Sequence, residues 1–73
     1  MTDTVKLKEK IDEHGMKQCF IAEKLGISGY GFAKKLNNET EFKASEIKII
    51  CELLDITSLR EKEAIFFANK VDV

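Results

Sequence analysis

The chain contains no proline and only 4 glycines among its 73 residues. Proline breaks helices and glycine weakens them, so this scarcity favours an all-helical domain with short turns. No apolar run approaches the roughly 20 residues that a membrane-spanning helix needs. The N-terminus, with Asp3 and scattered lysines, lacks the pattern of a signal peptide. From these absences we expect a cytoplasmic protein that does not contact a membrane.

Cysteine and histidine are too sparse to indicate a disulfide framework, a metal site or a catalytic centre. Cys19 and Cys51 are isolated, and in a cytoplasmic protein we expect them to be reduced thiols. His14 is the only histidine and has no second ligand at a suitable spacing, so we expect it to pack or to cap a helix end. Nothing pairs a nucleophile with a base. The sequence therefore predicts no enzyme, no metal and no cofactor.

Length and charge indicate one small domain over residues 1–73. At this size a single core is only marginally stable, so oligomerisation would help. The net charge of −1 is unusual for a nucleic-acid-binding protein, but it is unevenly distributed. Residues 17–43 have a balance of +2, whereas residues 44–73 have a balance of −2. This polarity would turn the middle of the chain toward an anionic partner.

Residues 18–37 have the pattern of two short amphipathic helices joined by a glycine turn. Ile21, Ala22 and Leu25 form one apolar stripe at helical spacing. Gly26 follows this stripe, in the place where a left-handed residue closes a helix. The spacing predicts a helix-turn-helix.

The second helix of this pair is expected to begin after Ser28, whose hydroxyl can accept the next free backbone N–H groups as an N-cap. Phe32 and Leu36 are four residues apart and point into the core. The opposite face holds hydrogen-bonding and cationic groups without an acid, namely Tyr30, Ala33, Lys34 and Asn37. Such groups reach phosphates and base edges when a helix lies in a major groove.

The same segment resembles a known family, the helix-turn-helix regulators of the phage lambda repressor, Cro and xenobiotic-response-element type. Their opening glutamine, small contact alanine, turn glycine and apolar core positions are matched by Gln18, Ala22, Gly26, Ile27 and Phe32. The stretch LNNETEF, the helix after it and the closing IFFANKV are similar to small Cro-like prophage regulators. The resemblance implies a lambda-repressor-like bundle of about five short helices. Its expected partner is a double-stranded DNA operator, bound by a homodimer that exists in solution or only on DNA.

We predict a division of labour within this DNA-binding surface. Base edges are assigned to Ser28, Tyr30, Ala33 and Lys34. Phosphates are assigned to Lys17, Gln18, Lys35, Asn37 and Asn38. Gly29 and Gly31 either allow close approach of the backbone to DNA or are a tolerated weakness of the helix, and the sequence favours neither.

Two lysines depart from the family pattern. Lys17 stands at the N-cap where the family usually has Thr or Ser, so we expect no side-chain cap there. Lys35 stands where many members have an apolar or aromatic residue, which leaves Phe32 and Leu36 alone to anchor the second helix.

Two flanking segments are predicted to be scaffold helices. Residues 4–14 carry Leu7 and Ile11 on one stripe and end at Gly15. A helix from about Ser45 to Leu54 has the clearest core stripe, Ile47, Ile50, Cys51 and Leu54, and a second stripe of Ile49 and Leu53.

The C-terminal segment, residues 58–73, begins with a capping-box signature of Ser58 and Glu61. The apolar run 65–68 fits neither a helical nor a strand period, so a helix toward Asn69 and a short strand are both open. This segment is a candidate dimerisation element. Burial of the run against Ile49 and Leu53 within one chain is an equal alternative.

The sequence thus predicts a small prophage repressor or Cro-like transcription regulator. A helical protein-interaction module, such as an antitoxin or an anti-repressor partner, is the alternative. The net acidity and the aromatic C-terminal run favour that second class.

Overall fold

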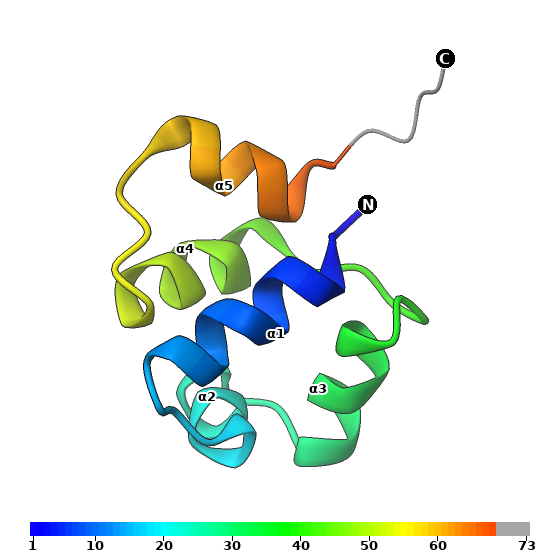
Figure 1. Cartoon of the computed structure of the whole chain (residues 1–73). Helices are drawn as coiled ribbons and strands as arrows, with labels where there is room; N and C mark the ends of the chain where they lie inside the picture. Colours follow the sequence, from blue (N-terminus) through cyan, green and yellow to red (C-terminus); the bar gives the residue numbers. More distant parts are fainter. Residues whose placement is uncertain (69–73) are drawn as a thin grey trace.

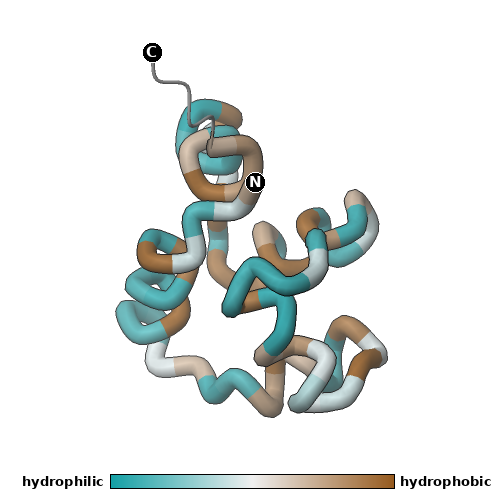
Figure 2. The backbone as a smooth tube through the Cα atoms, turned by 90° about the vertical axis from the view of Figure 1, so that its right-hand side faces the viewer, coloured by the Kyte–Doolittle hydropathy of each residue, from teal (hydrophilic) through white to brown (hydrophobic). Residues whose placement is uncertain are grey.

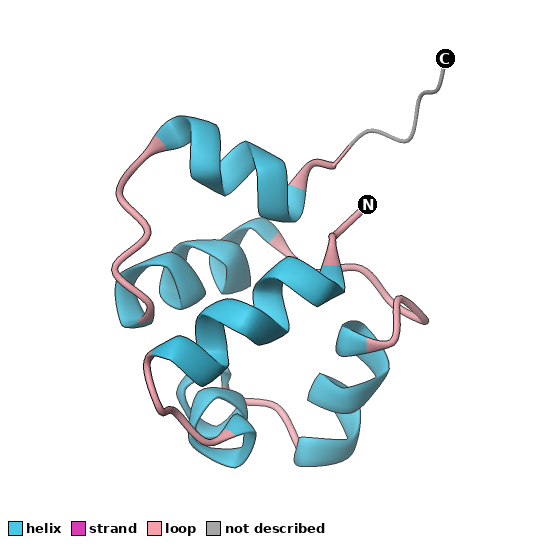
Figure 3. Ribbon diagram, in the orientation of Figure 1, coloured by secondary structure: helices cyan, strands magenta, loops and turns pink. Residues whose placement is uncertain are grey.

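Five short helices follow one another along residues 1–68, the part of the chain that the computed structural model describes, and these residues contain no strand (Figures 1 and 3). Their bounds are α1 Thr4–Glu13, α2 Gln18–Leu25, α3 Gly29–Leu36, α4 Ala44–Leu53 and α5 Leu59–Phe66. In Figure 1, α1 and α4 lie in the middle of a compact globule, α2 and α3 lie at one end, and α5 lies at the other. The predicted all-α fold is therefore confirmed for this part of the chain. None of its helices is both long and apolar enough to cross a bilayer.

The first four helices all end in the same way, on a residue in the left-handed backbone conformation. These residues are Gly15, Gly26, Asn38 and Asp55, with φ of 64°, 74°, 62° and 56°. In each case the next residue donates its N–H to a carbonyl five positions back, from Met16 to Ile11, Ile27 to Ala22, Glu39 to Lys34 and Ile56 to Cys51. This is the Schellman arrangement, which satisfies carbonyls that the helix leaves free. The two glycine ends were expected from the sequence, and the Asn38 and Asp55 ends were not.

The core is built from the inward stripe of each helix, and Figure 2 shows apolar and polar segments alternating along the tube. It comprises Leu7, Ile11, Ile21, Ala22, Phe32, Leu36, Phe42, Ile47, Ile50, Leu54, Ile56, Ile65 and Phe66. Phe42, between α3 and α4, meets Phe32 and Phe66 edge to face, with ring centroids 6.1 and 5.8 Å apart. Burial of this kind contributes on the order of 1.5–3 kcal/mol for each large side chain. The three rings tie α3 to α5 through the α3–α4 connection.

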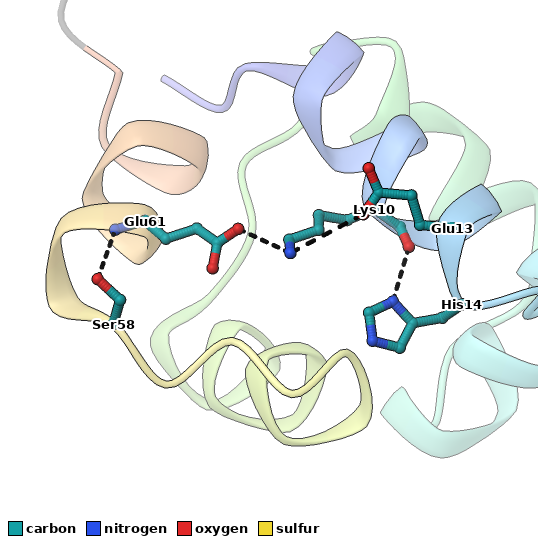
Figure 4. Close-up of polar contacts among 5 residues, drawn as sticks. All are labelled: Lys10, Glu13, His14, Ser58 and Glu61. Carbon is teal, nitrogen blue, oxygen red and sulfur yellow. Dashed lines mark hydrogen bonds and ion pairs between the residues drawn. The ribbon is translucent and has the colours of Figure 1, made fainter.

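Polar contacts join α1 to α5. Lys10 Nζ lies 2.7 Å from Glu61 Oε2 (Figure 4). The Asp3 N–H donates to the Ile65 carbonyl at 2.6 Å. The His14 ring closes α1, with Nδ1 3.0 Å from the Lys10 carbonyl oxygen. His14 thus caps a helix end, one of its two predicted roles.

α5 starts where the capping signature placed it, because Ser58 Oγ accepts the Glu61 N–H at 3.3 Å. The Glu61 carboxylate binds Lys10 instead of returning to Ser58. The helix ends at Phe66, so a helix, not a strand, forms the described part of the segment, and it is shorter than predicted. Phe67 and Ala68 do not continue the helix, and residues 69–73 lie outside the described residues.

The apolar run at the end of α5 divides between core and surface. Ile65 and Phe66 are buried within the monomer, whereas Phe67 is 56% exposed. Ile49 and Leu53 of α4 are half-buried. The C-terminal segment was predicted to contribute to a dimer interface. Ile65 and Phe66 are buried in the core of the monomer, so of these three side chains only Phe67 is on the surface.

Candidate nucleic-acid interface

α2 and α3 are joined by three residues, 26–28, each with a separate local task. Gly26 takes the left-handed conformation that ends α2. Ile27 is half-buried and packs against the core. Ser28 opens α3, and its Oγ accepts the Gly31 N–H at 3.0 Å. The two predicted helices and the turn between them are confirmed.

The outward face of α3 carries Tyr30, Ala33 and Lys34, three of the four residues assigned to base edges, together with Gly29 and Asn37. Gly29, Tyr30, Ala33 and Asn37 are exposed, and Lys34 is half-buried. Tyr30 is 76% exposed, and the Lys34 ammonium lies 5.6 Å from the centroid of its ring. This is within the range of a cation–π contact. One phenol and one ammonium are thus held together on a face without a carboxylate.

The residues assigned to phosphates, apart from Lys35, lie exposed at the ends of these two helices. Lys17 is the N-cap of α2 and makes no side-chain capping bond, as predicted. Gln18 is the first residue of α2. Asn37 closes α3, and Asn38 follows in the left-handed conformation.

Lys35 was expected to hold a phosphate, and the structure contradicts the exposed position that this role needs. Its side chain is 11% exposed, and Nζ lies 3.2 Å from Glu46 Oε1. The same ammonium donates to the Glu41 carbonyl at 2.9 Å and lies 5.9 Å from the centroid of the Phe42 ring. The reason is helical geometry, since Lys35 is three residues after Phe32 and shares its inward stripe. The prediction that Phe32 and Leu36 alone anchor α3 is also wrong.

The two glycines of α3 have different surroundings. A Cβ on Gly29 would meet nothing within 4 Å, so the protein itself does not require glycine there. A Cβ on Gly31 would lie 3.3 Å from Ser28 Oγ. Gly31 therefore leaves room for the hydroxyl that caps α3, a reason that the sequence did not suggest.

Pairing within the protein alters the charge balance of this region. Lys35 is matched by Glu46, which is itself 8% exposed on its side chain. The accessible charges of residues 17–43 are then four lysines, Lys17, Lys24, Lys34 and Lys43, against three acids, Glu23, Glu39 and Glu41. The region stays positive by one charge, so any attraction to phosphates is modest for one subunit.

Glu46, the buried partner of Lys35, was not predicted from the sequence. Its Oε1 accepts the Lys43 N–H at 2.8 Å in the first turn of α4, the backbone half of a capping box. Glu46 follows Lys43 at the spacing of a capping box, but lysine stands where that signature has Ser or Thr. The helical spacing of Phe32, Lys35 and Leu36 was a signal that the Lys35 side chain lies on the buried face of α3.

No protein-family model, curated protein or solved structure matches this chain. In residues 1–68, no three His, Cys, Asp or Glu side chains are grouped so that they could hold a metal ion. Function is therefore inferred from the geometry of α2, α3 and their surroundings.

Proposed function

We propose that this chain binds duplex DNA in a sequence-specific manner, as a small lambda-repressor-like, Cro-like transcription regulator. The observation that carries the proposal is the outward face of α3. It follows a three-residue turn from α2 and presents Tyr30, Ala33 and Lys34 to solvent without an acid. A helix offered in this way fits the major groove, and its phenol, methyl and ammonium groups suit base edges.

The proposed contacts follow the exposed positions. Ser28, Tyr30, Ala33 and Lys34 meet base edges, and the Tyr30 ring is available to a thymine methyl group. Lys17, Gln18, Asn37 and Asn38 hold phosphates, which set the register of the protein on the duplex. Gly29 at the start of α3 either allows close approach of the DNA backbone or is a tolerated weakness of the helix. Lys35 is no longer among these contacts.

The proposed regulator acts in the cytoplasm as a homodimer on its operator and blocks transcription by occupying it. Few phosphate contacts are available to one subunit with a net charge of −1. Two subunits double these contacts, and they match a two-fold symmetric site.

Selection on a random duplex library at near-physiological salt tests the proposal. We expect the bound fraction to be enriched in a two-fold symmetric sequence, with half-sites about 10 base pairs apart. A library recovered without any enriched sequence would refute sequence-specific binding.

A protein-interaction module is the second candidate, and one observation favours it. Large apolar side chains outside the α2–α3 face are exposed, namely Met1, Val5, Leu59 and Phe67. Such side chains mark interaction surfaces when they gather in a patch. Retention on a DNA resin at low salt separates the two candidates, because an interaction module without affinity for DNA would pass straight through.

A further inference from the structure

A buried ionic cluster joins the end of α3 to the beginning of α4. The Lys35 ammonium contacts the Glu46 carboxylate and the Glu41 carbonyl, and the same carboxylate oxygen accepts the Lys43 N–H. One lysine in the last turn of α3 thus holds both the 37–43 connection and the first turn of α4. The ring of Phe42 lies below the ammonium, 5.9 Å from it, and belongs to the core.

This cluster is an unusual way to stabilise a small fold. A buried ion pair loses hydration on both partners, and an apolar pair of similar volume often serves stability as well or better. The ion pair instead contributes specificity of conformation, because its hydrogen bonds fix the backbone path of residues 37–43. Glu41 and Lys43 are held through their backbones, so the path of the chain between them is specified.

We propose that Lys35 and Glu46 are positioning residues for DNA binding, an inference that rests on the function proposed above. Their cluster sets the course of the 37–43 connection and so places Asn37 and Asn38 at phosphates while α3 lies in the major groove. The Schellman bonds of Asn38 and Glu39 to α3 define one end of this connection. The ammonium defines the other end. Lys35 itself touches no DNA.

The effect of one substitution on DNA affinity distinguishes positioning from simple electrostatics, because the two predict changes in opposite directions. Glu46→Gln removes a negative charge near a proposed polyanion site and keeps an oxygen that can accept the Lys43 N–H. Charge alone predicts that this variant binds DNA more tightly. Positioning predicts weaker binding, because the ammonium loses its carboxylate and the backbone path of residues 37–43 is no longer fixed.

The experiment measures the dissociation constant of the full chain for the duplex enriched from the library, or for a mixed-sequence duplex at low salt if no sequence is enriched. The variants are Lys35→Met, Glu46→Gln and the double variant. The double variant removes both charges and leaves no unpaired ion, so it is expected to fold even if a single variant does not. Ile65→Val, buried in α5, is the control for lost stability. Binding is measured where circular dichroism shows every protein folded.

We expect each single variant to bind about tenfold more weakly. The double variant should bind as weakly as either single, since all three lose the same cluster, and Ile65→Val should bind like the wild type. The slope of affinity against salt should stay unchanged in Lys35→Met and become shallower by about 0.9 in Lys17→Met, which removes a proposed phosphate contact.

Two results would overturn the inference while leaving the proposed function intact. One is a Glu46→Gln variant that binds as tightly as the wild type or more tightly. The other is a Lys35→Met variant whose salt slope falls as in Lys17→Met, because that would make Lys35 a direct phosphate contact. A wild-type chain that binds neither duplex would overturn the proposed function and the inference together.

Discussion

Lys10 of α1 and Glu61 of α5 form the shortest ion pair in residues 1–68, with 2.7 Å between Nζ and Oε2 (Figure 4). The hydrogen bond to Glu61 raises the pKa of Lys10 above its ordinary value. A raised lysine pKa means that folding favours the charged form, so the pair stabilises the fold below the ordinary pKa. That contribution is lost as the pH rises through the raised value.

Glu61→Gln should therefore lower the free energy of unfolding at neutral pH. The difference from the wild type should shrink as the pH rises above the ordinary lysine pKa of about 10.4 and through the raised pKa of Lys10. Urea unfolding at several pH values measures this. Glu63→Gln, an exposed acid on the same helix, is the control. A Glu61→Gln deficit that persists undiminished at high pH would show that the ion pair is not its source.

Gly26→Ala should lower the free energy of unfolding by about 1 kcal/mol, because its φ of 74° places a Cβ in a strained conformation. No neighbouring atom lies within 4 Å of that Cβ, so the effect isolates backbone strain from steric contact. Thermal or urea unfolding measures it. An unchanged stability would mean that the turn can relax without loss.

Gly29→Ala decides between the two hypotheses for this glycine. The position is open and helical, so alanine should preserve stability or raise it by up to about 0.5–1 kcal/mol. If Gly29 serves close approach to DNA, affinity for the selected duplex should fall although the fold is more stable. Equal affinity would leave only the tolerated-weakness explanation.

Lys34→Ala and Lys17→Ala should affect DNA binding in different ways. Loss of a base contact at Lys34 should cost about 1–3 kcal/mol on the selected duplex and relax its sequence preference. Loss of a phosphate contact at Lys17 should weaken all duplexes alike and flatten the salt dependence by about one unit. Titrations on selected and scrambled duplexes at several salt concentrations measure both. Equal loss of discrimination in the two variants would contradict the assignment.

The two cysteines should differ in reactivity. Cys19 is exposed, whereas burial raises the pKa of the Cys51 thiol and lowers its thiolate fraction. A thiol reagent near pH 8 should therefore modify Cys19 rapidly and Cys51 slowly in the folded chain. Cys19→Ser should leave only the slow reaction, and urea should make it fast. A fast residual reaction in folded Cys19→Ser would contradict the half-buried position of Cys51.

Local signals predicted much of the secondary structure. Gly26 and Ser28 marked the turn between α2 and α3 because their effects involve only the next few residues. The helix that ends at Asn38 closes by the same backbone geometry as the one at Gly26. It was missed because asparagine takes the left-handed conformation less often than glycine, so its presence is a weaker signal.

Lys35 shows where local reasoning stops. Its spacing from Phe32 predicts the inward stripe, but a lysine is normally exposed, and only a buried partner reverses that preference. The partner, Glu46, lies in a different helix, and only the tertiary fold brings its carboxylate within 3.2 Å of the lysine ammonium. The run at Ile65 and Phe66 is a similar case, because its pattern fits neither a helical nor a strand period, and only the packed core shows that these two side chains are buried.

The amino-acid sequence by itself determined the helices, the glycine ends of α1 and α2, the serine caps of α3 and α5, and an outer face of α3 that carries no acid, because each depends on neighbours a few residues apart. The tertiary structure alone decided which charges are free to meet a partner. It buried Lys35 against Glu46 and joined Lys10 to Glu61, because ion pairs between helices depend on distances that only the packed core establishes.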